Sequence, residues 1–115
     1  MGIFGIFRRQ RRGGGPRRGD ATHLESWAAT HHGVEAYVEP RTMVTDTTVV
    51  LIAHDGEWTR RRIADPAAAR ALGRRLGIPV YDVALVGYPQ RMRDYTRRQT
   101  IIERRRQAAR DQGRT

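Results

Sequence analysis

The sequence predicts a small α+β domain in which helices pack on a four-stranded sheet, in the order α-β-β-β-α-β-α. Five apolar residues in a row, 49–53, are typical of a strand that is covered on both faces. Asp55-Gly56 then indicates a hairpin turn, and Asp65-Pro66 is typical of the start of a helix. A further strand after that helix favours a right-handed crossover connection.

The first helix is expected to begin near Ala21, because Thr22 and Glu25 have the spacing of a capping box. Gly33 is placed to end it. Its inward face consists of residues at helical spacing, namely Leu24, Trp27, Ala28 and His31.

The next three segments are predicted strands. In residues 34–39 apolar and polar side chains alternate up to Pro40, which predicts a half-buried strand. The strand within 47–54 and its return strand 57–63 are expected to join through a two-residue type I′ turn at Asp55-Gly56.

Asp65 is the expected N-cap of the second helix, which ends at Gly77 and whose inward face is Ala68, Leu72 and Leu76. Residues 80–88 are predicted to form the fourth strand. From Gln90 nothing breaks a helix until Gly113, and its docking residues are Met92, Tyr95, Gln99 and Ile102.

Charge and composition divide the chain into three parts. Residues 1–18 carry six Arg and no acid, residues 19–89 seven Arg and nine acids, and residues 90–115 nine Arg and three acids. We therefore expect a flexible arm at 1–19, a near-neutral domain at 20–96, and a basic helical extension at 97–115 whose end frays.

These two basic ends are the first candidate site for a polyanion, because each neutralised phosphate adds a salt-dependent, sequence-independent contribution to affinity. The alternative is a pair of solvated tails that keep a small protein soluble. All 22 basic residues are Arg, a bias that a GC-rich genome would also produce. The candidate arginines are Arg8, Arg9, Arg11, Arg12, Arg17, Arg18, Arg97, Arg98, Arg104, Arg105 and Arg106.

The second candidate site is the segment 88–95, where aromatic and Arg side chains interleave at a helix start. Tyr88 and Tyr95 could stack on bases while Arg91 and Arg93 hold phosphates. The alternative is that Met92 and Tyr95 dock the last helix and the arginines are exposed.

The three arginines 60–62 are a related case. Arg60 and Arg62 lie beside Trp58 on one face of the predicted strand. They form either a basic sheet face or, as we favour, cross-strand ion pairs with Glu35, Glu39 or Asp46.

Catalytic and cofactor motifs are not recognisable. The chain has no Cys and no Lys, and its four His lack the spacing of a zinc enzyme. Gly13–Pro16 neither follows a strand nor opens a helix in the dinucleotide-binding pattern. We assign no catalytic residue, no metal ligand and no cofactor, and expect a binding protein rather than an enzyme.

No apolar run approaches the ~20 residues that span a bilayer, so a cytoplasmic location is the expectation. Met1–Phe7, with two Ile and two Phe before the first arginines, could give weak contact with a membrane surface or cover an apolar patch.

Two resemblances extend these expectations. The α-β-β-β-α order over 21–76 resembles the double-stranded-RNA-binding domain, although the start of its last helix here, Asp65–Ala69, lacks the basic cluster of that fold. Residues 33–95 are similar to short actinobacterial proteins of unknown function, some labelled oxidoreductase, through the segments VEAYVEPRT, TTVVLIAHDGEWTRRRI, GIPVYDV and VGYPQRMRDY. This resemblance implies an actinobacterial, cytosolic origin and no mechanism.

The sequence thus favours an accessory protein that engages RNA, DNA or a ribonucleoprotein electrostatically through its arginine-rich ends. One alternative is a regulatory module that binds a protein partner or forms a homodimer, since roughly 70 residues bury only a thin core. The other is a small enzyme without a recognisable motif.

Overall fold

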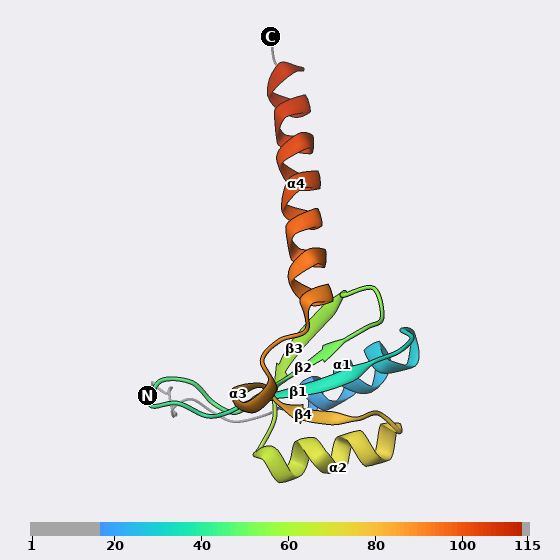
Figure 1. Ribbon diagram of the computed structural model, residues 1–115, viewed down its shortest axis with the longest axis vertical. Helices are drawn as coiled ribbons and strands as arrows, with labels where there is room; N and C mark the ends of the chain where they lie inside the picture. The colour runs from blue at the N-terminus through green and yellow to red at the C-terminus, as the bar shows by residue number, and fades with distance from the viewer. Residues whose placement is uncertain (1–16, 114–115) are drawn as a thin grey trace.

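The computed structural model describes residues 17–113, and within them it contains one four-stranded sheet and four helices (Figure 1). The predicted α+β fold is confirmed. The elements are α1 (Arg18–Ala29), β1 (Glu35–Glu39), β2 (Thr48–Ile52), β3 (Trp58–Arg62), α2 (Pro66–Leu76), β4 (Val80–Asp82), α3 (Val83–Val86) and α4 (Gln90–Gln112).

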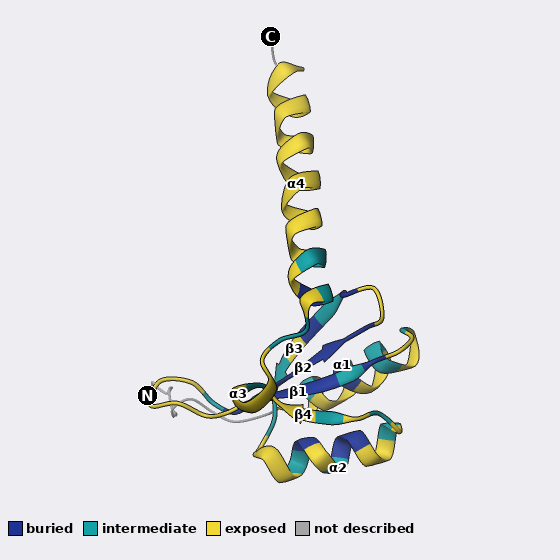
Figure 2. Ribbon diagram, in the orientation of Figure 1, coloured by how far each residue is buried: buried dark blue, intermediate teal, exposed yellow. Residues whose placement is uncertain are grey.

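The strand order in the sheet is β3-β2-β1-β4. β2 runs antiparallel to both of its neighbours, and β4 runs parallel to β1, with Ala36 opposite Val80. The apolar run 49–53 is buried along its whole length, as expected for a central strand (Figure 2). Helix α2 provides the crossover between the antiparallel strands and β4.

Helices α1 and α2 pack on the same face of the sheet, where Leu24 and Leu72 meet Ala36 and Leu51 in the larger apolar cluster. The close approach of α2 to β4 depends on Gly73. A Cβ at this position would lie 2.2 Å from a methyl carbon of Val80, so a larger residue would force the helix away from the strand.

The opposite face of the sheet is covered by the first turns of α4. Met92 packs against Tyr37, Val50 and Ile52 in a second apolar cluster. The prediction that β1 is half-buried is therefore wrong, because Tyr37, expected on an open face, is only 6% exposed.

Helix α1 begins at Arg18, before the expected start. The carboxylate of Asp20 accepts a hydrogen bond from the backbone N–H of Arg17 at 3.0 Å, and this contact defines the helix start. The expected capping box of Thr22 and Glu25 is wrong, since Thr22 lies within the helix and donates to the carbonyl of Arg18. Arg17 and Arg18, which we placed in the arm, thus adjoin the domain.

The β2–β3 hairpin forms where expected but with a different turn. The N–H of Gly56 donates to the carbonyl of Ala53 at 3.0 Å, and Ala53 and Glu57 pair beyond it. The loop therefore contains three residues, His54 to Gly56, rather than two. Gly56 has φ of 93°, typical of three-residue hairpins whose last loop residue is left-handed.

The fourth strand is shorter than predicted. It ends at Asp82, whose carboxylate accepts a hydrogen bond from the N–H of Ala84 at 2.8 Å and starts the short helix α3. An Asp side chain at an N-cap thus overrides an apolar run that favoured continued strand. Gly87, at φ of 73°, ends the helix.

Helix α4 projects away from the sheet (Figure 1). Met92 is its only buried residue, and every residue from Thr96 to Gln112 is exposed (Figure 2). This part is about 25 Å long at 1.5 Å per residue. The helix continues, as predicted, to just before Gly113. The fraying that we expect at its end stays a prediction, which amide hydrogen exchange can measure.

Gly56→Ala tests how closely the hairpin packs against α4. A Cβ at Gly56 would lie 2.0 Å from the backbone oxygen of Arg91, and the positive φ adds strain. We expect a loss of about 3 kcal/mol in the free energy of unfolding, measured by urea denaturation. Gly77→Ala is the matched control, because Gly77 has φ of 70° with nothing within 4 Å, and should lose only about 1 kcal/mol. Equal losses in the two variants would contradict a close contact between Gly56 and the start of α4.

Amide hydrogen exchange tests the end of α4. Beyond Thr96 its hydrogen bonds are protected only by local helix formation, so we expect residues 97–112 to exchange far faster than Met92 and the α2 backbone. Added salt should slow this exchange, because it screens repulsion among the arginines. Protection equal to that of α2 would indicate that α4 packs against something in solution.

Candidate nucleic-acid interface

The segment 88–95 lies where α4 meets the sheet and the tip of the β2–β3 hairpin. Arg91 is held there by three acceptors. Its guanidinium donates to the carboxylate of Glu35 at 2.6 Å, to the carbonyl of Ala53 at 2.9 Å and, at 3.5 Å, to that of Ile52. Arg91 therefore fixes the start of α4 on the end of β2.

A second polar cluster surrounds Glu39 on the same face. Its carboxylate accepts hydrogen bonds from Nε and Nη2 of Arg60, at 2.6 and 2.9 Å, and from the hydroxyl of Thr48 at 2.6 Å. The hydroxyl of Tyr88 donates to it as well. Of the ion pairs expected for the 60–62 arginines, the one between Arg60 and Glu39 is present.

The ionisation of this cluster follows from these bonds. Burial acts to raise the pKa of Glu39, but the hydrogen bonds from Arg60, Thr48 and Tyr88 outweigh it and hold the pKa below its ordinary value. Burial, together with the hydrogen bond to Glu39, raises the pKa of Tyr88. At neutral pH the cluster is thus a carboxylate satisfied by one arginine and two hydroxyls.

The hairpin itself adds two more contacts to α4. The indole N–H of Trp58 donates to the hydroxyl of Thr96 at 3.1 Å, and Arg98 donates to the carbonyl of Asp55 at 3.0 Å. The guanidinium of Arg98 also lies 5.9 Å from the ring centre of Tyr95. These contacts end the docked part of the helix.

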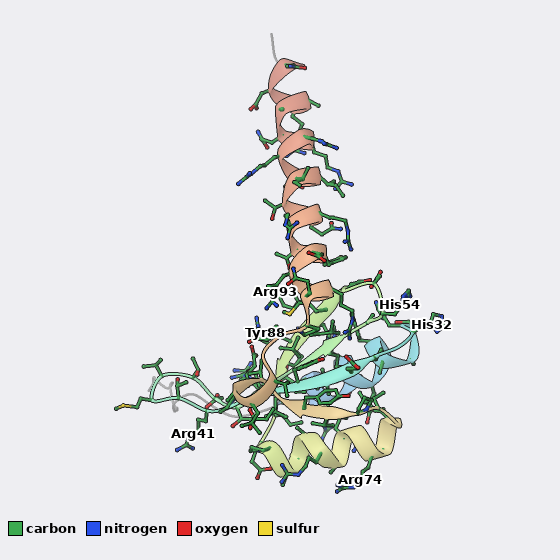
Figure 3. All side chains as sticks on the ribbon, viewed as in Figure 1. His32, Arg41, His54, Arg74, Tyr88 and Arg93 are labelled. Atoms are coloured by element: carbon green, nitrogen blue, oxygen red, sulfur yellow. The ribbon has the colours of Figure 1, made fainter. Side chains whose placement is uncertain are left out.

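The four residues of segment 88–95 that we predicted to bind nucleic acid therefore differ in how far they are available to a partner. Tyr88 and Arg91 have their polar atoms engaged with Glu39 and Glu35. The segment therefore docks the helix, but Arg91 takes part in the docking and is not exposed as the alternative expected. Arg93 is exposed (Figure 3), and its guanidinium donates to the neutral side chain of Gln90 at 3.2 Å. Tyr95 is half-buried under Arg98.

Beside this junction lies an open recess of about 370 Å³. Its apolar floor is formed by Tyr88 and Met92, and two arginines stand at its edge. Its lining residues are Tyr88, Met92, Arg93, Thr96 and Arg97.

The arginines of α4 are mostly left without internal acid partners. Among the described residues, Arg97 pairs with Asp94 at 3.2 Å and Arg110 with Glu103 at 3.1 Å. The three arginines 104–106 are exposed and make no ion pair within the described part of the chain. From residue 97 to 112 there are six Arg and two acids.

Helical geometry groups several of these arginines. At 100° per residue Arg93, Arg97 and Arg104 fall within an arc of about 40° on the side opposite Tyr95. Arg98 and Arg105 lie on the adjacent side. We call Arg93, Arg97 and Arg104 the α4 arginine face. This face points away from Tyr95, whereas Arg98 contacts the hairpin.

The other predicted arginines are placed as follows. Arg17 and Arg18 are exposed at the start of α1. Arg106 lies on α4 outside the arginine face. Arg8, Arg9, Arg11 and Arg12 lie outside the described residues.

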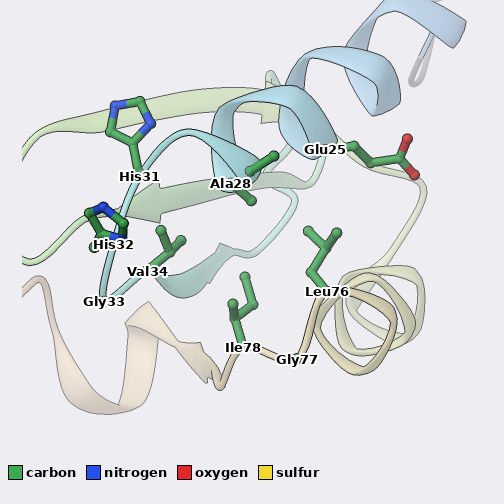
Figure 4. Close-up of a pocket in the computed structure, with 10 residues that line it drawn as sticks. Glu25, Ala28, His31, His32, Gly33, Val34, Leu76, Gly77 and Ile78 are labelled. Atoms are coloured by element: carbon green, nitrogen blue, oxygen red, sulfur yellow. The ribbon is translucent and has the colours of Figure 1, made fainter.

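A separate recess of about 430 Å³ opens on the other face of the sheet, between the ends of α1 and α2 (Figure 4). Ala28, Val34 and Ile78 contribute apolar atoms, and His31 and His32 stand at its edge.

His31 is already engaged in internal contacts. It stacks on Trp27 at 3.7 Å between ring centres and lies 3.2 Å from the carboxylate of Glu57. Within residues 17–113 no three His, Asp or Glu side chains are grouped to hold a metal ion.

The sequence did not indicate that Arg91 fixes the start of α4 on the sheet through Glu35 and the carbonyl of Ala53. No protein-family profile, curated protein or solved structure matches this chain.

Glu39→Gln tests the polar cluster. The neutral amide keeps the shape but loses the charge that Arg60 faces, so we expect the free energy of unfolding at neutral pH to fall by about 1–2 kcal/mol. Because folding lowers the pKa of Glu39, its stabilisation is present above the unfolded pKa and is lost as pH falls through the folded pKa. The wild type should therefore lose more stability on acidification than the variant.

Glu25→Gln is the control for this experiment. Glu25 pairs with Arg75 at 2.8 Å, but both side chains are about half exposed, so the change should cost less than about 0.5 kcal/mol. If Glu39→Gln lowered the free energy of unfolding by as little as Glu25→Gln, the contacts of Tyr88 and Arg60 with Glu39 would not contribute to stability.

Proposed function

We propose that the protein binds nucleic acid, alone or within a ribonucleoprotein, through electrostatic contacts that do not depend on base sequence. The observation that carries this proposal is the free part of α4. It extends about 25 Å from the domain, is exposed on all sides, and carries six Arg against two acids.

The arrangement of charge supports phosphate binding. Arg side chains present a planar fork that matches phosphate oxygens, and an exposed helix can follow a backbone without reorganising the domain. Arg93 and Arg104 are separated by about 17 Å along the axis, which is enough to reach several phosphates. The two glutamates of β1, Glu35 and Glu39, are paired with Arg91 and Arg60, so they do not oppose the approach of an anion.

The recess beside Tyr88 and Met92 adds a place where an unstacked base could meet an apolar floor with Arg93 and Arg97 beside it. The arginines of residues 8–12 enter the proposal only through their charge. RNA and DNA both present the phosphates that the arginine face would bind.

The test is fluorescence anisotropy of a labelled RNA and a labelled DNA across a salt series, with the full chain. Replacing Arg104, Arg105 and Arg106 by Gln should lower affinity at least about tenfold at near-physiological salt. It should also reduce the salt slope by about one unit for each arginine that contacts a phosphate.

Replacing Arg41, Arg70 and Arg74 by Gln is the control, since it removes the same charge from exposed positions outside α4. If this control lost as much affinity as the α4 variant, net charge rather than α4 would account for binding. If the wild type did not bind either nucleic acid, the proposal would be overturned.

A further inference from the structure

The end of the sheet opposite the β2–β3 hairpin gathers segments from distant parts of the chain. β1 and β4 run parallel and both finish there, so the β1–β2 loop (residues 40–47) and α3 leave from the same end. β3 finishes there too, and Asp20 near the start of α1 lies 3.8 Å from Arg61 and 3.9 Å from Arg62. We call this end the loop pole.

Four large apolar side chains of the loop pole are exposed over more than half of their surface. Met43 and Val44 are 102% and 90% exposed, and Leu85 and Val86 are 83% and 60% exposed. The loop and α3 lie on the same side of the molecule, away from α4 (Figure 1). Single exposed apolar residues are ordinary, but two adjacent pairs at one end mark an interaction surface.

The loop holds its apolar pair in a defined turn. The hydroxyl of Thr42 accepts the backbone N–H groups of Val44 and Thr45, at 3.2 and 3.0 Å. The N–H of Thr42 donates to the carbonyl of Thr45, and the two hydroxyls lie 2.6 Å apart. Met43 and Val44 are thus the two tip residues of a turn that closes below them.

Arginines and acids both lie around the loop pole. Arg41 is exposed next to the tip (Figure 3), and Arg17 and Arg18 are exposed at the start of α1. Asp65 and Asp82 are also exposed there, where they cap helices through the N–H groups of Ala68 and Ala84, and Asp46 lies half-buried in the loop. In sequence, the residues that precede Arg17 add four arginines and the apolar stretch Met1–Phe7.

We propose that the loop pole docks on an anionic lipid surface, with Met43, Val44, Leu85 and Val86 inserted among the headgroups. Both apolar pairs protrude, and protruding side chains can enter a fluid interface more readily than they can pack on a rigid partner. Arginines beside apolar tips provide the two signals that reversible membrane binding needs. The described residues include no helix of the length and apolarity needed to cross a bilayer, and surface docking requires none.

This inference does not rest on the proposed function, because α4 leaves from the opposite end of the sheet, where Arg91 and Arg98 contact the hairpin. The two surfaces can therefore be tested separately. A second copy of this chain and the segment Met1–Phe7 are the competing occupants of the loop pole.

Co-sedimentation of the full chain with vesicles tests the proposal. Vesicles of phosphatidylcholine with about 30% phosphatidylserine should bind the wild type, and pure phosphatidylcholine should bind it far more weakly. Met43→Ser with Val44→Ser, and separately Leu85→Ser with Val86→Ser, should each weaken binding at least about tenfold. These side chains contact little in the fold, so circular dichroism should show unchanged structure.

Ile101→Ser with Ile102→Ser is the matched control, because these residues are also exposed but lie on α4. It should leave vesicle binding unchanged, and the loop-pole variants should leave nucleic-acid affinity unchanged. Equal vesicle binding by every variant would overturn the proposal in favour of the arginines alone. A loss of self-association in the loop-pole variants, without a loss of vesicle binding, would assign the surface to a second copy.

A labelling experiment measures insertion directly, since the chain has no Cys of its own. An environment-sensitive dye on Met43→Cys should shift to the blue with anionic vesicles, and the same dye on Ile101→Cys should not. A blue shift on Met43→Cys without vesicles, abolished by Ile3→Ser with Phe4→Ser, would show instead that Met1–Phe7 covers the tip.

Discussion

The contact of Arg91 with Glu35 and with the carbonyls at the end of β2 is the interaction on which the arrangement of this molecule depends. A half-buried guanidinium that satisfies one carboxylate and two backbone oxygens fixes a direction as well as a position. Gly56 allows the approach, because its missing Cβ leaves room for the backbone of Arg91. Only the first turns of α4 are needed for this junction, and the remaining turns are free to extend into solvent.

This junction also determines which arginines are paired with acids and which are not. Arg60 and Arg91 neutralise the two glutamates that β1 presents on this face, so the sheet carries little net charge beside α4. The arginines farther along α4 have few acids in reach. A strongly basic chain thus keeps a nearly neutral domain and concentrates its unpaired charge on a separate element, where it interferes least with folding.

The sequence predicted the order of elements apart from α3, and it predicted the central place of β2 in the sheet, because apolar periodicity and capping residues are local signals. It did not predict the hairpin type, since Asp-Gly fits both two-residue and three-residue loops and only the pairing of Ala53 with Glu57 decides between them. It placed Tyr37 on an open face because the cover comes from Met92, more than fifty residues later. The exposed tips of the loop pole were not foreseen for the same reason, as burial is decided by what distant segments leave uncovered.

The shortness of β4 has a consequence for how the chain folds and opens. Its three residues pair with β1 across a separation of forty-four positions, whereas β1, β2 and β3 follow one another through short connections. Local pairing is fast and long-range pairing is slow, so we expect β4 and the crossover helix α2 to join a three-stranded sheet that has already formed. Within the sheet and the helices that cover it, we expect them to detach first in a fluctuation, which would uncover the backbone of β1 along Ala36 to Val38. An unprotected central strand of this kind is a template for pairing between chains, and the fit of Gly73 against Val80 is what keeps it closed.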